Sequence, residues 1–199
     1  VKLAKELTEK AGMKKIFFGN SGAEANEGAI KLARKYSFDK YGKDRSTILT
    51  LVQSFHGRTI TTLKATGQDK FHQFFYPFTE GFNYVKANDI EDFKEKLTSD
   101  VCAIMMEAIQ GEGGVIPLDK DFIQEVVRIC NEKDIIVIFD EVQCGIARTG
   151  KLFGYQNFDI TPDIVTVAKG LGAGLPIGGF LCNEKLEDVF KPGDHGSTF

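Results

Sequence analysis

Two ionisable residues at the ends of apolar segments carry the clearest chemistry in this sequence. Asp140 follows IIVIF, and Lys169 follows DIVTVA and precedes three closely spaced glycines. A lysine at the end of a buried strand loses its proton readily when desolvated, and its free amine can form a Schiff base with a carbonyl group. A carboxylate at the edge of a buried strand usually has a cationic partner or a metal. Alone, each residue would be an ordinary charge at a strand end.

A third group of residues could bind a phosphate. In GNSGAEANE, Ser21 and Glu24 form an S-x-x-E capping box, and Gly22 allows a tight turn into a long helix. A helix that begins just after a strand presents unpaired N–H groups and the positive end of its dipole. The motif alone also fits a capped helix without a ligand. Together, a phosphate site, a Schiff-base lysine and a ring carboxylate are the three anchors that pyridoxal 5'-phosphate requires.

A nucleotide triphosphatase is the competing hypothesis. Asp140 and Glu141 after four apolar residues resemble a Walker B strand, and GIARTGK reproduces most of a P-loop. However, Leu152 replaces the hydroxyl residue that would hold Mg²⁺, and this segment begins only five positions after Asp140. The segment GIARTGK therefore fits the P-loop pattern poorly.

The elements that must position these residues indicate an α/β fold. Continuous apolar strands between helices are typical of a mostly parallel sheet flanked by helices. Strands are predicted at residues 16–18, 47–52, 101–106, 135–139, 164–168 and 179–182. Helices are predicted at residues 2–10, after Ser21, and at 89–97, 121–132 and 184–190. Residues 66–82, which are rich in Gly and Phe, are expected to form an ordered loop.

Composition narrows the class of partner. The 199 residues are 42% hydrophobic and 27% charged, with a net charge of -3 and no apolar run long enough for a membrane span. Small-molecule substrates are therefore expected, with no nucleic acid and no membrane. The four dispersed cysteines and the lack of a close histidine pair favour a cytoplasmic protein without a metal site.

The ends of the sequence predict a piece of a longer protein. The chain begins at Val1 rather than Met, and it stops in the polar stretch PGDHGSTF without a closing element. No internal repeat or linker is evident, so a single α/β domain is the simplest organisation.

Six motifs in order closely resemble those of the class III (omega-amino acid) aminotransferases: FFGNSGAEANEGAIKLARKY, FHGRT, QGEGGV, FDEVQCGIARTG, PDIVTVAKGLGAGLPIGG and GDHGSTF. The resemblance runs through essentially the whole chain. It implies the large domain of fold type I pyridoxal-phosphate enzymes over residues 1–199, without the N-terminal segment and the C-terminal small domain. It also implies a homodimer with the site at the subunit interface.

The resemblance assigns cofactor roles to particular residues. Lys169 would carry the Schiff base and move the proton, and Asp140 would pair with the ring nitrogen. Gln143 would contact the ring hydroxyl, and Phe55 would stack on the ring. The phosphate would be held by Gly22, Ala23 and, from the neighbouring subunit, Thr198.

Substrate roles follow from the same resemblance. Arg58 would receive the substrate α-carboxylate, a task suited to a planar guanidinium. Ser197 would lie next to the same substrate. Glu112 would pair with a gating arginine that is not expected within these residues. Three departures from the family pattern, Ala108, Cys144 and Ala147, remove no cofactor anchor.

Within the family, the motifs are most similar to those of enzymes that act on N2-acetyl-L-ornithine. The implied reaction moves its terminal amine to 2-oxoglutarate, giving N-acetyl-L-glutamate 5-semialdehyde and L-glutamate, a step of arginine biosynthesis. Succinylornithine, ornithine or 4-aminobutyrate transamination, or an aminomutase reaction, remain alternatives. His56 and Arg58 in FHGRT favour the acylornithine substrates.

Overall fold

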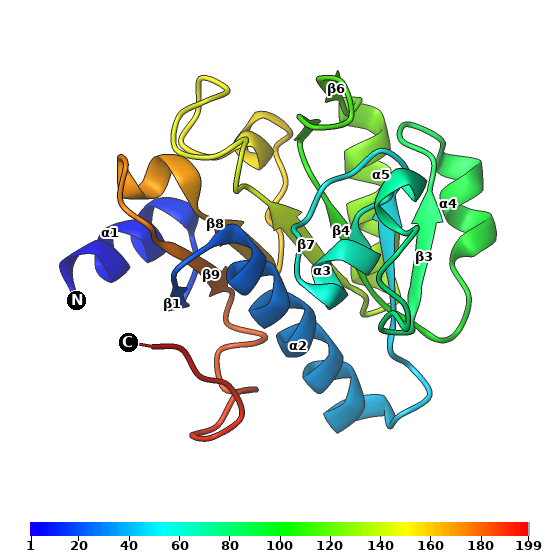
Figure 1. Ribbon diagram of the computed structural model, residues 1–199, viewed down its shortest axis with the longest axis horizontal. Helices are drawn as coiled ribbons and strands as arrows, with labels where there is room; N and C mark the ends of the chain where they lie inside the picture. Colours follow the sequence, from blue (N-terminus) through cyan, green and yellow to red (C-terminus); the bar gives the residue numbers. More distant parts are fainter. Residues whose placement is uncertain (199) are drawn as a thin grey trace.

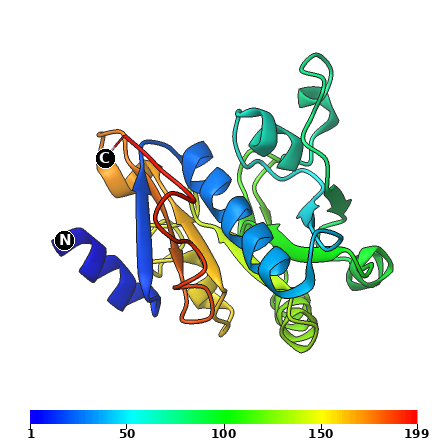
Figure 2. The same ribbon diagram turned by 90° about the horizontal axis from the view of Figure 1, so that it is seen from below.

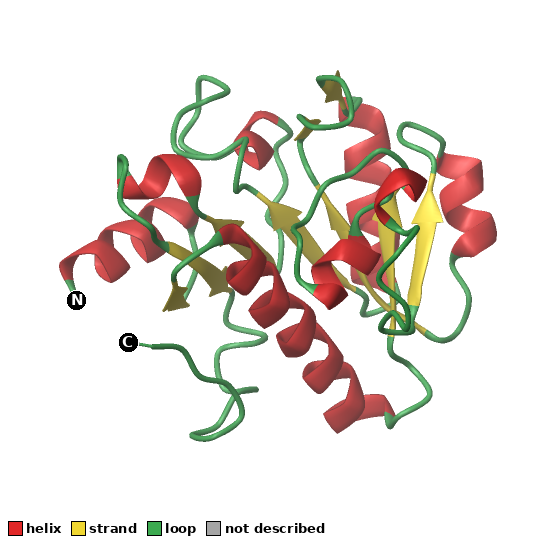
Figure 3. Ribbon diagram, viewed as in Figure 1, coloured by secondary structure: helices red, strands yellow, loops and turns green. Residues whose placement is uncertain are grey.

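The computed structural model describes residues 1–198, and a seven-stranded sheet forms its centre (Figures 1 and 3). The strands lie in the order β1, β9, β8, β7, β4, β2, β3. Strand β9 runs antiparallel to both of its neighbours, β1 and β8, and the other paired strands of this sheet are parallel. The prediction of an α/β fold with a mostly parallel sheet is confirmed.

The bounds of the elements are as follows. The helices are α1 Lys2–Ala11, α2 Gly22–Tyr41, α3 Ile60–Ala65, α4 Ile90–Lys96 and α5 Lys120–Glu132, with short 3-10 turns η1 Asp69–Phe71, η2 Gly154–Asn157 and η3 Lys169–Gly172. The strands are β1 Lys15–Gly19, β2 Thr47–Leu51, β3 Phe82–Val85, β4 Val101–Met106, β7 Ile136–Asp140, β8 Ile164–Val167 and β9 Gly178–Cys182, with a separate hairpin of β5 Ile109–Gln110 and β6 Ile116–Pro117.

Apolar side chains on both faces of the sheet explain why its central strands are continuous hydrophobic runs. Alternate residues of β7 enter different clusters: Val137 and Phe139 pack with α1, α4 and α5, whereas Ile136 and Ile138 pack with α2. Figure 2 shows the long α2 on one side of the sheet and α4 and α5 on the other. No helix in the described residues is both long and apolar enough to cross a membrane.

One predicted helix is wrong. Residues 184–190 form successive turns, in which Leu186 N–H donates to Asn183 O and Val189 N–H donates to Leu186 O. The amphipathic spacing serves a different purpose here, because Leu186 is buried against the α2 face of the sheet while Lys185 reaches out to Asp134. Contacts of these side chains with the rest of the fold outweigh the local helical preference.

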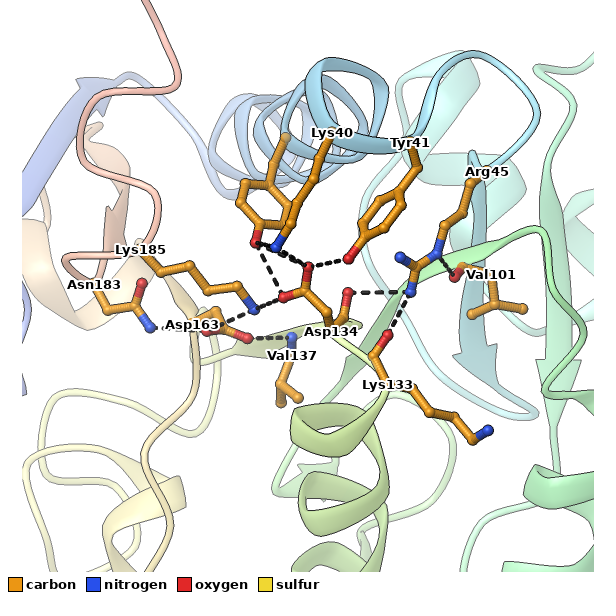
Figure 4. A network of polar contacts seen from close by, with 11 residues as sticks. Lys40, Tyr41, Arg45, Val101, Lys133, Asp134, Val137, Asp163, Asn183 and Lys185 are labelled. Carbon is orange, nitrogen blue, oxygen red and sulfur yellow. Dashed lines mark hydrogen bonds and ion pairs between the residues drawn. The ribbon is translucent and has the colours of Figure 1, made fainter.

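A polar network around Asp134 joins three distant segments at the opposite end of α2 from Ser21 (Figure 4). The carboxylate accepts hydrogen bonds from Tyr36 Oη at 3.0 Å, Lys40 Nζ at 2.7 Å and Tyr41 Oη at 2.6 Å, and Lys185 Nζ lies 2.7 Å away. Burial pushes the pKa of this carboxyl upward, but the bonds from Lys185, Lys40 and Tyr41 outweigh it and hold the pKa well below its usual range. The network therefore fixes the end of α2 against the turn before β7.

Candidate active site

A cavity of about 320 Å³ opens at the carboxyl ends of the parallel strands. Its walls come from the segments that follow β1, β2, β4, β7 and β8, and ligands of open α/β sheets bind at this edge. The structure brings seven of the predicted site residues together here: Gly22, Ala23, Phe55, Glu112, Asp140, Gln143 and Lys169.

Asp140 is held firmly at the end of β7. Asn26 Nδ2 donates to its Oδ2 at 2.8 Å, His56 Nδ1 lies 2.8 Å from the same oxygen, and Val142 N–H donates to its Oδ1 at 3.0 Å. The residue is only 3% exposed. These contacts offset the cost of burying the carboxylate and fix its orientation.

His56 and Asn26 were not predicted as partners of Asp140, and each retains an unsatisfied polar atom. Both line the cavity, and within residues 1–198 neither His56 Nε2 nor Asn26 Oδ1 has a hydrogen-bond partner. Buried polar atoms are normally paired, so orphaned atoms on a cavity wall fit a polar ligand. The available sequence signal for Asn26 was a polar residue on the alanine-rich, buried face of α2.

Lys169 occupies a strained backbone position directly after β8. Its φ is 44°, in the left-handed region that non-glycine residues rarely adopt, and the residue lines the cavity. Such strain costs roughly 1–3 kcal/mol and is concentrated at functional sites. The short 3-10 turn η3 begins at this residue, which is exposed, whereas the strand before it is buried.

The start of α2, where the sequence predicts a phosphate site, is capped by Ser21 and Glu24. Ser21 Oγ accepts the N–H of Glu24 at 3.2 Å, and the Glu24 carboxylate accepts the N–H of Asn20 at 2.9 Å. A Cβ on Gly22 would lie 2.8 Å from Val142 Cγ1, so only glycine lets the helix approach the segment after β7 this closely. Gly22 and Ala23 line the cavity at the positive end of a 20-residue helix.

Glu107 supports the part of the cavity wall that contains Phe55, and it was not predicted from the sequence. The residue is 4% exposed, and its Oε2 accepts the N–H of Phe55 at 3.0 Å. Burial raises the pKa of Glu107 to about 7, since the lowering by His56 is countered by the nearby charge of Asp140. The carboxyl thus holds the loop that carries Phe55.

Gln143 and Glu112 reach the cavity from neighbouring loops. An added Cβ on Gly111 would overlap the Oε1 of Gln143 at 1.4 Å, so the first glycine of QGEGG makes room for the Gln143 side chain. Glu112, next in that motif, is exposed and lines the cavity mouth.

Three predicted residues lie outside the cavity wall. Arg58 is exposed just beyond Gly57, with its guanidinium carbon 5.5 Å from the ring centre of Phe55. Thr198 Oγ1 accepts a hydrogen bond from Asn20 Nδ2 at 3.0 Å, and Asn20 does line the cavity. Ser197 lines a smaller hollow beside Phe180.

The features of a nucleotide hydrolase are not reproduced. Glu141, the second acid of the Walker B resemblance, is buried and accepts the N–H groups of Gly154 at 2.7 Å and Tyr155 at 2.9 Å. The segment 145–151 forms turns and does not lead into an α-helix. In the described part of the chain, no group of three or more His, Cys, Asp or Glu residues is arranged to hold a metal ion.

Comparison with known proteins agrees with this geometry. The class-III aminotransferase family model matches residues 1–199. Acetylornithine aminotransferase of Haemophilus ducreyi is 59% identical over all of this chain and 51% of its own length. Succinylornithine transaminase of Photorhabdus laumondii is 47% identical over all of this chain and 50% of its own length. The chain therefore spans about half the length of these curated relatives.

A solved structure shares the arrangement of elements. The ornithine aminotransferase of Toxoplasma gondii, described with partial occupancy of PLP at its active site, superposes with a TM-score of 0.94. It is 34% identical, and the match covers 100% of this chain and 48% of that one.

Proposed function

Since this chain belongs to the class-III aminotransferases, we propose that it is the cofactor-binding large domain of a pyridoxal 5'-phosphate-dependent acetylornithine aminotransferase. The enzyme transfers the terminal amine of N2-acetyl-L-ornithine to 2-oxoglutarate, and its products are N-acetyl-L-glutamate 5-semialdehyde and L-glutamate. One observation carries the proposal: Lys169, Asp140 and the start of α2 meet on a single cavity.

The chemistry of the cavity wall fits this cofactor. A carbonyl group can be bound by the amine of Lys169, a ring nitrogen by the carboxylate of Asp140, and a phosphate by the N–H groups of Gly22 and Ala23. The unpaired atoms of His56 and Asn26 favour a ligand with polar groups over an apolar one. When bound, pyridoxal 5'-phosphate supplies an electron sink for the carbon that loses its proton.

The residues of the chain then position the reactants and move protons. Lys169 would hold the cofactor through its amine, and the same amine would accept and return the substrate proton. Asp140 keeps a proton on the ring nitrogen, and its charge is preorganised by Asn26 and His56. Phe55 covers the ring face, and Gln143 binds the ring hydroxyl.

Residues nearer the surface select the substrate. Arg58 binds the α-carboxylate of the donor, and Ser197 contributes next to the same substrate. Glu112 pairs with a gating arginine while the omega-amine donor reacts and releases it for glutamate. Thr198 completes the phosphate site of the neighbouring subunit in a homodimer. We place the enzyme in arginine biosynthesis in the cytoplasm. N-succinylornithine is the second candidate donor, because a transaminase named for it is 47% identical to this chain.

Trapping the cofactor in the full-length protein tests the assignment. After addition of pyridoxal 5'-phosphate, borohydride reduction and peptide mapping should identify a pyridoxyl group on Lys169. Lys169→Ala should lose the label and the cofactor absorbance band, whereas Lys151→Ala, which changes an exposed lysine, should keep both. A label elsewhere, or normal turnover by Lys169→Ala, would refute the role of this lysine. Rates with acetylated, succinylated and free ornithine then identify the donor.

A further inference from the structure

The guanidinium of Arg58 rests on the aromatic ring of Phe71. Its Cζ lies 4.4 Å from the ring centre of Phe71, closer than the 5.5 Å to Phe55. Lys70 Nζ lies 4.9 Å from the same Phe71 ring. Within residues 1–198, neither Arg58 nor Lys70 forms an ion pair, so aromatic contacts are the interactions that hold the guanidinium.

The backbone ties Phe71 to the loop that carries Arg58. Phe71 N–H donates to Gln68 O at 3.0 Å, and the buried Gln68 side chain donates through Nε2 to Ser54 O at 3.0 Å. The rings of Phe71 and Phe55 also meet edge to face, with centroids 6.0 Å apart. The position of the Phe71 ring is therefore set relative to both Phe55, at the cavity, and Arg58, at its edge.

Two cations on one ring suit an anionic group of the substrate. Arginine side chains lose rotamer freedom when they bind a carboxylate, and a ring that already holds the guanidinium reduces this loss. Lys70 raises the local positive charge without neutralising Arg58. The contact thus prepares Arg58 for an anion before any substrate arrives.

We propose that Phe71 is a positioning residue that determines specificity for donors bearing an α-carboxylate, because its ring holds the Arg58 guanidinium at the cavity edge. This inference rests on the proposed transaminase function. It predicts that loss of the ring harms only substrates that have the carboxylate. It also predicts that another aromatic residue at this position preserves activity toward substrates that have the carboxylate.

Two donors that differ only in the carboxylate test the proposal in the full-length enzyme loaded with cofactor. N-acetylputrescine is N2-acetylornithine without its α-carboxylate. Phe71→Leu should lower kcat/KM for acetylornithine about five- to tenfold, mainly through KM, and change the value for N-acetylputrescine less than about twofold. Arg58→Ala should show a larger loss with the same selectivity. Slow donors are followed in a single turnover by the cofactor absorbance.

Matched variants separate positioning from general damage. Phe71→Tyr keeps the aromatic face and should restore the KM for acetylornithine. Phe74→Leu removes a nearby ring that is 79% exposed and whose aromatic contact is with Phe75, and it should behave as wild type. Equal losses for both donors, or no loss in Phe71→Leu, would overturn the inference while leaving the transaminase function intact. If the wild-type protein transaminates neither donor, the proposed function fails and this inference fails with it.

Discussion

The imidazole of His56 lies against the carboxylate of Asp140, with Nδ1 2.8 Å from Oδ2, and both side chains are almost completely excluded from solvent. An N–H on Nδ1 donates to this carboxylate, which leaves Nε2 unpaired on the cavity wall. Asn26 also bridges the two residues, since its Nδ2 lies 2.7 Å from His56 O. Asp140 is thus held by an imidazole and an amide.

Asp140→Asn should lower kcat of the full-length enzyme at least about a hundredfold, because an amide of the same shape cannot keep a proton on the ring nitrogen. Steady-state rates and the cofactor absorbance spectrum measure the effect. Asp163→Asn is the control, since Asp163 is also buried but accepts the N–H of Val137 away from the cavity. The control should reduce stability and preserve kcat per folded molecule. Similar kcat values for both variants would contradict the role of Asp140.

Asp134→Asn should destabilise the protein by about 2 kcal/mol, because hydrogen bonds to a partly buried charged group are lost and Lys40 and Lys185 remain without their partner. The pKa of Asp134 is lowered in the folded state. Its contribution is therefore complete above the ordinary aspartate pKa of about 4, declines as the pH falls below that value, and is lost as the pH falls through the lower pKa of the folded state. Urea unfolding at pH 7 and pH 3 measures the difference between wild type and variant.

Asp159→Asn is the matched control for this network. Asp159 pairs with Lys120, but its side chain is 75% exposed, so solvent screens the pair and the change should cost far less stability than Asp134→Asn. If Asp134→Asn were as mild as this control, or if its effect were as large at pH 3 as at pH 7, the network would not stabilise the fold as described.

The strands that could be predicted from the sequence are those whose residues form continuous apolar runs. Strand β4 has the predicted bounds, and Asp140 and Lys169 do lie at the carboxyl ends of parallel strands. Strand β3 was missed because it lies at the sheet edge, where Asn83 is exposed and interrupts the apolar pattern. The antiparallel direction of β9 has no local signal, since it depends on how the chain returns between β1 and β8.

The site was predicted less completely, for a related reason. Charged residues at strand ends and a capping box are local patterns, but Asn26, His56 and Glu107 become part of the site through burial beside Asp140. A polar residue on a helix or after a strand is usually solvated, so its burial can be recognised only when the neighbouring elements are in place. Phe71 likewise can be recognised as part of the site only through its contact with Arg58.

Glu107→Gln should make the stability of the cofactor-free protein less dependent on pH. The folded-state pKa of about 7 lies above the ordinary glutamate value of about 4.3, so the folded protein binds this proton more tightly than the unfolded chain does. Its stabilising contribution is fully present below about pH 4 and declines as the pH rises through 7. The groups that face the carboxyl are His56 and Asp140. Between pH 5 and 8, the variant should gain on the order of 2 kcal/mol relative to wild type.

Thermal or urea unfolding at intervals across that pH range measures the gain in the free energy of unfolding of the variant relative to wild type. Burial also raises the pKa of Glu141 to about 7, but this residue is unchanged in both proteins and cancels in the difference. Glu112→Gln is the control, because Glu112 also lines the cavity but is exposed to solvent. The stability of this variant should change with pH as that of wild type does. A Glu107→Gln variant with the wild-type slope would mean that Glu107 takes up no proton near neutral pH. The carboxyl would then stand beside Asp140 as a second anion, and the loop that carries Phe55 would be held by a charged group.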